Sequence, residues 1–417
     1  MSEGIITIKK GREKPILNQH PWIFSGAITS AQNATPGDIV TVVDHQGSFL
    51  ARGYWNPKSQ IQVRILTWHD EPINEDWWRR MLQRAIDGRA LQNITQEEYS
   101  EESFGSIAYR LINAENDFLP GLIVDRYANF LVLQVLTLGI DQRKEMISEI
   151  MSSLLPIQGI YERSDVDVRG REGLEDTCGV LWGEEPPALI EIGERFVRIL
   201  VDVHNGHKTG FYLDQMVNRD LLVILLSGDY GGDFPWRVLN MFSYTGGFGL
   251  HALSWNGVSA VFVDSSEDAL KLAKQNIELN ITHGVIDPER GNEYELIQAD
   301  AFDYLHAAVE RGEQFDVIVC DPPKFAHNKQ QVDRATRGYK DLNLNCFKLI
   351  KPGGYLMTFS CSGAISADLF QKVVFGALAD SGRQAQIIKH LGPADDHPVA
   401  LTFPEGAYLK GLLLRVY

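Results

Sequence analysis

The C-terminal half of the chain alternates hydrophobic runs of strand length with amphipathic runs of helix length. Apolar runs at 238–242, 260–264 and 315–320 each precede a segment with helical spacing. Repeated strand–helix–strand order builds a parallel sheet that helices cover on both faces. The last run, KGLLLRVY, fits a further strand at the C-terminus. We therefore predict an α/β domain with a Rossmann-like, doubly wound sheet over residues 201–417.

Two further domains precede this sheet in a chain of 417 residues. Residues 1–72 contain the runs ITIKK, GDIVTVVD, FLARGYW and IQVRIL, which are separated by turn residues and predict a small β-barrel. Residues 73–200 open with a helix whose apolar positions include Trp77, Met81 and Leu82. The runs GLIVDRY, FLVLQVL, ALIEIG and FVRILVDV follow as strands. This middle part is therefore predicted to be a small α+β domain.

Composition limits the classes of partner. The formal net charge of −16 argues against a grip on nucleic acid by the whole protein surface, so any RNA contact must rest on local basic groups. No apolar stretch is long enough for a membrane span and no apolar leader stands at the N-terminus, so we expect a cytoplasmic protein without membrane contact. The four cysteines show no metal-ligand spacing, so we expect free thiols and no metal.

A glycine-containing turn follows the run that ends at 242. Ser243 to Gly249 read SYTGGFG, and glycines at a strand-to-helix turn let a ligand approach the backbone. The next predicted strand ends in Asp264, which is placed to bond ribose hydroxyls. A nucleoside-containing cofactor fits this pair, but so does a plain tight turn. Gly247-x-Gly249-x-x-Ala252 also matches the dinucleotide pattern of hydride-transfer enzymes.

The end of the following strand separates these alternatives. It carries Asp321-Pro322-Pro323-Lys324-Phe325, in which two prolines fix the backbone around a carboxylate. A rigid acceptor beside the cofactor suits a planar nitrogenous group, and hydride transfer has no evident need of it. The motif therefore favours methyl transfer from S-adenosylmethionine over oxidation and reduction.

Cys361 lies in Ser360-Cys361-Ser362, at the end of the next strand and thus at the same sheet edge as Asp321. A thiol there can attack an electron-poor ring carbon. The alternative is a buried, inert cysteine. Strand alternation points Cys320 away from Asp321, so we expect Cys320 to pack against a helix. Cys346 has the spacing of a helix core, and Cys178 falls in a turn-like stretch without partners.

Two stretches contain side chains that suit binding. The segment after Asp321 holds Lys329, Arg334 and Arg337 with few acids, and we predict a basic loop that contacts phosphate or is simply solvated. Before the sheet, HKTGFYLDQ places Tyr212 and Gln215 among aromatic and amide residues that packing alone does not explain.

Taken in order, these motifs resemble the bacterial and archaeal large-subunit ribosomal RNA cytosine-5 methyltransferases that carry an N-terminal PUA domain. The resemblance covers nearly the whole chain. It rests on motifs in all three parts: KKGREKPILNQHPWIFSGAI, PGD, RGYWNPKSQIQVRIL, RLINAENDFLPGLIVDRY, YERSDVDVRGREGLE, HKTGFYLDQMVNR, NMFSYTGGFGLHAL, VDSSEDAL, DPPKFA, SCSG and DHPVALTFPEGAYLKGLLLRVY.

The resemblance implies a fold and a reaction. It implies a PUA barrel, a small α+β domain and a class I methyltransferase domain. The substrate would be 23S ribosomal RNA, the cofactor S-adenosylmethionine, and the assembly a homodimer. Cys361 would be the nucleophile and Asp321 the partner of the base. The expected cofactor contacts are Tyr212, Gln215, Phe242, Ser243, Gly246, Asp264, Ser265, Asp300, Ala301 and Asp321, and the expected substrate contacts are Pro322, Lys324, Phe325 and Arg337.

Two departures keep alternatives open. Asn240 stands at the end of the first strand, where many methyltransferases carry an acid. The Asp-Pro-Pro motif also occurs in relatives that methylate guanine, so the motif does not fix the base. The rivals are a guanine methyltransferase, a dinucleotide-dependent oxidoreductase and an RNA-binding protein without activity.

Overall fold

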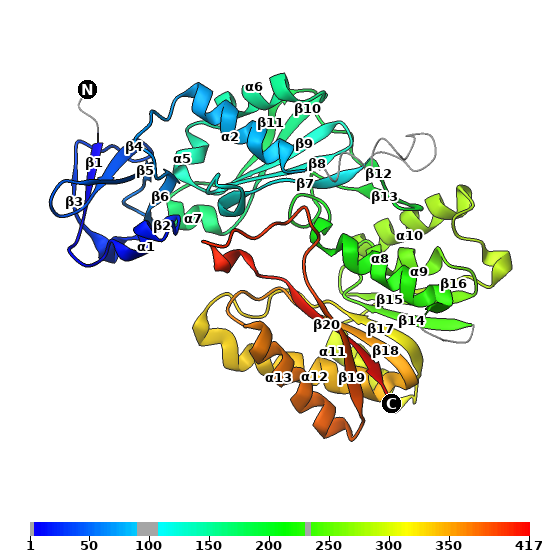
Figure 1. Cartoon of the computed structure of the whole chain (residues 1–417). Helices are drawn as coiled ribbons and strands as arrows, with labels where there is room; N and C mark the ends of the chain where they lie inside the picture. The colour runs from blue at the N-terminus through cyan, green and yellow to red at the C-terminus, as the bar shows by residue number, and fades with distance from the viewer. Residues whose placement is uncertain (1–3, 90–106, 230–234) are drawn as a thin grey trace. The chain divides into compact units, whose positions relative to one another are not determined.

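The computed structural model describes residues 4–89, 107–229 and 235–417, which form two compact units (Figure 1). No helix in these ranges is both long and apolar enough to cross a membrane. The domain boundaries at 72/73 and 200/201 remain a prediction. The first unit comprises Met1–Ile192, Val201–Leu213 and Asp396–Gly406, and the second comprises Gly193–Leu200, Asp214–Asp395 and Ala407–Tyr417.

The first unit begins with a curled six-stranded sheet in the order β2-β6-β5-β4-β1-β3 (Figure 1). Strand β1 runs parallel to β4 and antiparallel to β3. Alternate residues such as Val40, Val42 and Val63 face a small core, as period-two patterning requires. The elements are β1 Gly4–Ile8, α1 Lys14–Leu17, β2 Trp22–Phe24, β3 Ile28–Gln32, β4 Ile39–Val43, β5 Phe49–Trp55 and β6 Ile61–Thr67.

A five-stranded sheet in the order β11-β10-β9-β8-β7 completes the first unit. Helix α2 covers it with Trp77 and Trp78, and Asn74 caps the helix by accepting from the Trp77 backbone N–H. Strands β9 and β10 are parallel and helix α6 connects them. The elements are α2 Glu75–Asp87, β7 Ala108–Asn113, β8 Leu122–Tyr127, β9 Phe130–Val135, α5 Leu138–Asp141, α6 Lys144–Leu154, β10 Gly159–Ser164, α7 Val168–Glu172 and β11 Thr177–Gly183.

One prediction for this region needs correction. Cys178 lies in strand β11 opposite Arg163, not in a turn, because an antiparallel partner strand overrides the weak local signal. Its thiol is also hydrogen-bonded to Asp165, so it has a partner. The runs ALIEIG and FVRILVDV form strands as predicted, and they pair as a separate two-stranded sheet of β12 Ile190–Glu194 and β13 Val197–Val201.

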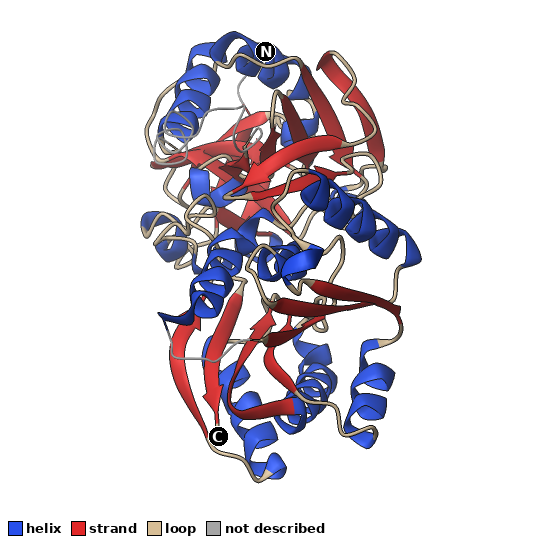
Figure 2. Ribbon diagram, turned by 90° about the vertical axis from the view of Figure 1, so that its right-hand side faces the viewer, coloured by secondary structure: helices blue, strands red, loops and turns tan. Residues whose placement is uncertain are grey.

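The second unit is a seven-stranded sheet in the order β16-β15-β14-β17-β18-β20-β19 (Figures 1 and 2). Strand β20 runs antiparallel to both of its neighbours, β18 and β19. It is the predicted C-terminal strand, whereas its edge neighbour β19 was not predicted. The strands are β14 Trp236–Met241, β15 Val258–Asp264, β16 Glu293–Gln298, β17 Phe315–Cys320, β18 Ile350–Ser360, β19 Ala385–Leu391 and β20 Lys410–Val416.

Helices cover both faces of this sheet. One core joins Leu239 and Ile318 with α11, α12 and α13, and the other joins Val238 and Val317 with α8 and α9. This alternation confirms the doubly wound α/β prediction. The helices are α8 Met216–Ile224, α9 Gly247–Leu253, α10 Glu267–Thr282, α11 Ala301–Glu310, α12 Val332–Leu349 and α13 Ala367–Ser381.

The basic segment after Asp321 is not the long loop that was predicted. Helix α12 begins at Val332, so Arg334 and Arg337 are exposed residues of a helix. The helix forms because Ala335, Tyr339 and further apolar residues at helical spacing are buried in the core. Arg337 therefore faces solvent from a fixed helix surface rather than from a loop.

Candidate active site

The turn after β14 adopts an unusual backbone. Phe242 and Tyr244 have positive φ angles of 56° and 49°, and Gly246 has 92°. Left-handed conformations are costly for residues other than glycine, and they cluster at functional sites. Gly249 is required for a different reason, because a Cβ there would lie 2.1 Å from the ring of Phe262. This turn is therefore held in a strained shape while α9 packs closely against β15.

Asn240 secures the start of α9. Its side chain is buried, and its Oδ1 accepts from the backbone N–H of Gly249 at 3.0 Å. An amide thus replaces the acid that many methyltransferases carry at this position, and it satisfies a helix N–H that would otherwise lack a partner. Asn240 therefore stabilises the turn that leads into α9.

Asp264 links the turns that follow β14 and β15. Its Oδ2 accepts from the Tyr244 backbone N–H at 2.8 Å, and its Oδ1 accepts from the Ser266 N–H at 2.9 Å. Ser266 in turn caps α10. The neighbouring Ser265 carbonyl accepts from Gln298 at 3.3 Å. Each carboxylate oxygen of Asp264 retains a second lone pair for a ligand hydroxyl.

Two buried hydroxyls in the turn test whether a nucleoside cofactor fits. Ser243 Oγ and Thr245 Oγ1 are buried and have no hydrogen-bond partner among the described residues. Buried polar groups are nearly always paired, so two unpaired hydroxyls here are suited to bind the polar groups of a ligand. Hydroxyls beside the Asp264 carboxylate suit the polar ribose and amino-acid parts of S-adenosylmethionine, so the residues present fit this group.

The third strand contributes a helix cap. Asp300 Oδ1 accepts from the N–H groups of Phe302 and Asp303 at 2.8 and 3.2 Å, while the residue itself is exposed. Ala301 is buried in the core, and Phe302 is only half-buried. Phe302 stacks with Phe325 at a centroid distance of 6.2 Å. An apolar surface for a flat ring therefore comes from Phe302 rather than from Ala301.

Gln215 and Asp321 are joined directly. Gln215 Nε2 donates to Asp321 Oδ2 at 2.8 Å, and Asn218 donates to Gln215 Oε1 at 2.6 Å. Gln215 and Asn218 are buried at the start of α8, while Asp321 follows β17. The prediction named Gln215 and Asp321 but missed Asn218, whose spacing of three residues on a helix was an available signal.

Cys361 lies beside the Asp-Pro-Pro turn. Its Sγ is 3.9 Å from the carbonyl oxygen of Pro322, and its side chain is partly buried. Because β17 and β18 are parallel neighbours, both turns lie at the carboxyl edge of the sheet. Cys320 is instead fully buried against Cys346 of α12, as predicted from strand alternation.

The hydroxyl of Tyr339 connects these two turns. It is bonded to Ser360 Oγ and to Ser362 Oγ, each at 3.0 Å, and Ser362 Oγ also accepts from the Ala326 N–H at 3.1 Å. Both serines that flank Cys361 are therefore held by one buried residue of α12. Burial raises the pKa of Tyr339, so the phenol stays neutral as a donor and acceptor.

Lys410 supports the same turn from β20. Its Nζ donates to the carbonyl oxygens of Ser362 and Ile365, both at 2.7 Å. Burial lowers the pKa of Lys410 to about 8; Cys361 acts in the opposite direction, and Lys324 lowers it further. The sequence analysis missed this residue, although KGLLLRVY begins with it.

The remaining predicted substrate residues differ in exposure. Pro322 is buried, Lys324 is exposed, and Phe325 is half-buried with its ring 4.8 Å from that of Tyr339. Arg337 is exposed two residues before Tyr339 and thus on a different side of α12. No cluster of His, Cys, Asp or Glu able to hold a metal occurs among the residues that the structure describes.

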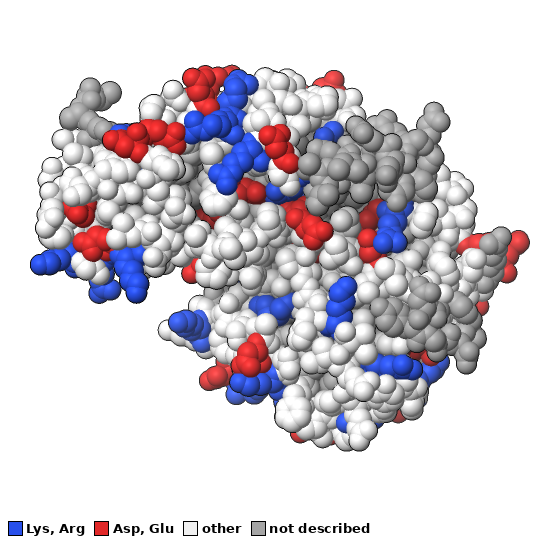
Figure 3. Space-filling model, in the orientation of Figure 1, with Lys and Arg blue, Asp and Glu red and all other residues white. Residues whose placement is uncertain are grey.

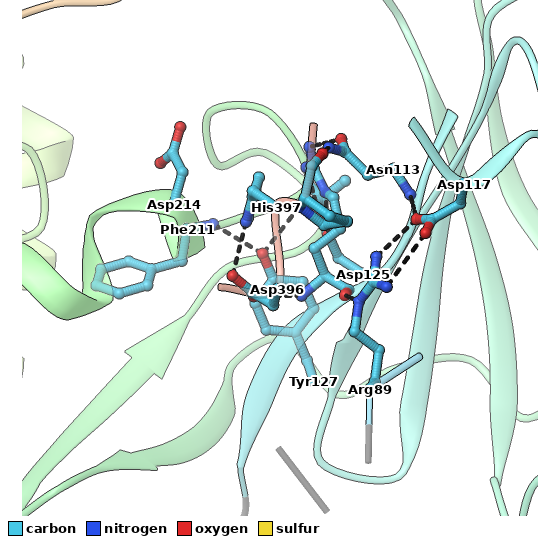
Figure 4. A network of polar contacts seen from close by, with 12 residues as sticks. Arg89, Asn113, Asp117, Asp125, Tyr127, Phe211, Asp214, Asp396 and His397 are labelled. Carbon is cyan, nitrogen blue, oxygen red and sulfur yellow. Dashed lines mark hydrogen bonds and ion pairs between the residues drawn. The ribbon is translucent and has the colours of Figure 1, made fainter. Parts of the chain in front are cut away.

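Tyr212 belongs to the first unit. Its hydroxyl lies 3.3 Å from His207 Nδ1, and Lys208 Nζ is 4.4 Å from its ring centroid. The preceding Phe211 is fixed by its backbone N–H, which donates to the hydroxyl of Tyr127 at 3.1 Å (Figure 4). Tyr212 therefore follows a firmly anchored backbone segment.

That anchor is part of a buried polar network in the first unit (Figure 4). Asp125 accepts from Arg110 at 2.8 and 2.9 Å and from the Thr209 hydroxyl at 2.5 Å. Burial alone would raise the pKa of Asp125, but Arg110 and Thr209 outweigh it and the pKa is lowered. The Arg110 backbone N–H donates to Asp396, which bonds His397 at 2.8 Å. The segments around 209 and 396 are thus tied to β7 and β8.

A separate pocket of about 500 Å³ lies in the N-terminal part of the first unit. Phe24 is 50% exposed there, and Trp22 packs edge-on against Phe403 at 4.7 Å. On the face shown in Figure 3, Lys and Arg occur in small groups among Asp and Glu rather than as one field. The residues that line the pocket are Gly11, Arg12, Pro15, Ile16, His20, Trp22, Ile23, Phe24, Gly26, Ala27 and Glu405.

Family models match two parts of the chain. A PUA-like domain matches residues 6–68, and a family described as Conserved hypothetical protein 95 matches residues 234–347. Ribosomal RNA large subunit methyltransferase I of Salmonella arizonae is 45% identical over 413 residues, which are 99% of this chain and 97% of that protein. The protein of the same name from an Enterobacter species is also 45% identical, over 99% of both chains.

Solved structures show the same fold. A putative methyltransferase in complex with SAH has a TM-score of 0.81 at 21% identity, over 99% of both chains. A putative SAM-dependent methyltransferase from Streptococcus mutans has a TM-score of 0.80 at 20% identity, again over 99% of both. The whole chain therefore shares one architecture with these proteins.

Proposed function

This chain belongs to the ribosomal RNA large subunit methyltransferase I family, and we propose that it methylates carbon 5 of a cytosine in 23S ribosomal RNA. Family membership removes the oxidoreductase alternative. The observation that carries the proposal is the position of Cys361, whose sulfur lies 3.9 Å from the Pro322 carbonyl that adjoins Asp321. A nucleophile and a rigid base-binding carboxylate thus share one edge of the sheet.

Cytosine needs a nucleophile because its carbon 5 is itself unreactive. The Cys361 thiolate forms a bond to carbon 6, which makes the ring electron-rich at carbon 5. When bound, S-adenosylmethionine supplies a methyl group on a sulfonium. Carbon 5 gains the methyl group and S-adenosylhomocysteine is released as the thioether. Carbon 5 then loses its proton to solvent water, the bond from sulfur to carbon 6 breaks, and the Cys361 thiolate is regenerated. The target base must leave its stack to reach this edge.

Asp321 orients the base in this proposal. The Gln215 amide donates to Oδ2 of this carboxyl group and fixes its orientation. A carboxyl group held in this way can accept from the 4-amino group of cytosine and, in its protonated form, donate to N3, where the charge of the addition develops. Phe325, half-buried against Phe302 and Tyr339, offers an apolar ring surface next to it. The carboxylate and the aromatic surface together recognise a flat base with an exocyclic amine.

Guanine methylation is the second candidate, because the 2-amino group of guanine would also suit Asp321. The two bases differ in their need for Cys361, since methylation of guanine on nitrogen requires no addition of sulfur. RNA containing 5-fluorocytidine distinguishes the two candidates. Its carbon 5 carries fluorine in place of the proton that must leave before the bond to Cys361 can break, so the covalent adduct is trapped. We expect a covalent adduct with wild type and Cys178→Ala, and none with Cys361→Ala. Absence of an adduct with wild type, when methyl transfer to normal RNA proceeds, would favour guanine.

The pocket of the N-terminal sheet is proposed as an RNA contact. Phe24 and Trp22 offer rings on which an unpaired base can stack, and Arg12 and His20 stand at the pocket wall. Such a local site is compatible with the formal net charge of −16, because RNA binding there does not require a basic surface over the whole protein. A homodimer and a cytoplasmic location remain predictions, the former testable by light scattering on the purified protein.

A further inference from the structure

Lys410 is a buried lysine directly beside the turn that carries Cys361. It is the first residue of β20 and pairs with Ser360 of β18 across the antiparallel ladder. Only 8% of its surface is exposed. Its Nζ donates to the carbonyls of Ser362 and Ile365, one and four residues beyond Cys361. Lys410 thus fixes the backbone that follows the cysteine.

The charge of this lysine calls for a partner. Burial of an ammonium group is costly unless an anion or several hydrogen bonds compensate it. Two carbonyls use two of its three hydrogens, and no Asp or Glu forms an ion pair with Lys410 among the residues that the structure describes. Cys361 directly precedes the Ser362 whose carbonyl Lys410 binds, and its ionised form would act favourably on the ammonium.

We propose that Lys410 is a positioning residue that holds the Cys361 sulfur as a thiolate and fixes the turn that presents it. The role rests on the proposed function of Cys361 as the nucleophile. The thiol proton passes to solvent when the pair forms, so no co-reactant is needed. Other titratable groups at this place are Lys324 after β17, Tyr339 of α12, and Asp321, which precedes Pro322. Tyr339 stays neutral, and Lys324 is exposed.

The test measures the thiolate itself rather than methyl transfer. The rate of alkylation of each cysteine by iodoacetamide is followed as a function of pH by mass spectrometry of its peptide, without cofactor or RNA. In wild type, Cys361 should react at lower pH than the exposed Cys178, whose pKa is raised by burial and Asp165. A midpoint for Cys361 equal to or above that of Cys178 overturns the proposal, and this comparison needs no variant.

Variants then assign the effect to the charge. Lys410→Met should raise the midpoint for Cys361 by about one pH unit, whereas Lys410→Arg keeps most of the effect. The matched control is Lys389→Met on the neighbouring strand β19, where the lysine is exposed. A folded Lys410→Met protein with an unchanged profile contradicts the proposal. Methyl transfer by Cys361→Ala would instead contradict the proposed function, so the two failures are distinguishable.

Discussion

Gln215 and Asp321 are joined by a hydrogen bond of 2.8 Å, although 106 positions separate them in the chain. The bond connects the start of α8 to the end of β17, and Asn218 fixes the far end of the Gln215 amide. The carboxylate that we propose binds the base is therefore oriented by a second residue that is itself buried and hydrogen-bonded.

Gln215→Ala is expected to lower methyl transfer about tenfold or more, because a buried hydrogen bond to a charged group contributes roughly 1.5–3 kcal/mol. Steady-state kinetics with an RNA fragment provide the measurement. Gln371→Ala, at an exposed position of α13, is the control and should stay near wild type. Equal rates for Gln215→Ala and wild type would show that methyl transfer does not depend on the orientation of Asp321 by Gln215.

Asp264→Ala should weaken binding of S-adenosylhomocysteine by about two orders of magnitude. The carboxylate both faces the proposed ribose position and bonds the Tyr244 and Ser266 backbones, so its loss affects two turns. Calorimetry measures the affinity. Asp268→Ala, in the exposed first turn of α10, serves as the matched control. Undiminished binding in folded Asp264→Ala would place the cofactor elsewhere.

Phe24→Ala should weaken binding of a 23S ribosomal RNA fragment about tenfold, since stacking of a base on an aromatic ring contributes about 1–3 kcal/mol. Affinity for S-adenosylhomocysteine should not change. Phe375→Ala removes a ring that is 68% exposed from α13 and controls for loss of apolar surface. If both variants bind RNA like wild type, the N-terminal pocket is not an RNA contact.

The buried carboxylate of Glu194 should make the free energy of unfolding depend on pH. Burial would raise its pKa, but Arg219 and His251 outweigh burial and hold the pKa at about 2, below the ordinary 4.5. A carboxylate with a lowered pKa stabilises the folded state above pH 4.5, and this contribution, of order 3 kcal/mol, is lost as the pH falls from 4.5 through about 2.

Urea unfolding of wild type and Glu194→Gln between pH 7 and pH 3 measures this effect. The difference in the free energy of unfolding should be constant above pH 5 and should shrink below pH 4.5. Glu191→Gln, in the same strand, controls for a general charge effect. A difference that does not change with pH would show that the carboxylate charge is not the stabilising feature.

The sequence predicted the parallel sheet because strand and helix periods alternate there without interruption, and it placed Asp264, Asp321 and Cys361 at strand ends. It could not predict that Asp264 bonds both turns, or that Tyr339 holds the serines on each side of Cys361. These contacts join residues from distant segments, and single-chain periodicity contains no information on which helix face meets which turn.

Two kinds of error have physical reasons. Helix α12 extends through the basic segment because its apolar residues recur at helical spacing between the charged residues. The loop was predicted from the many charged residues, and this apolar spacing was not considered. Lys410 was overlooked because a lysine at a strand end usually faces solvent. Its burial follows only from the antiparallel pairing of β20 with β18, a feature of the sheet order.

The most direct test of the account is nucleoside mass spectrometry of unmodified 23S ribosomal RNA after incubation with the purified protein and S-adenosylmethionine. Wild type and Cys178→Ala should form 5-methylcytidine, and Cys361→Ala should form none while still binding S-adenosylhomocysteine. Formation of 5-methylcytidine by Cys361→Ala, or of a methylguanosine by wild type, would contradict a covalent cytosine mechanism.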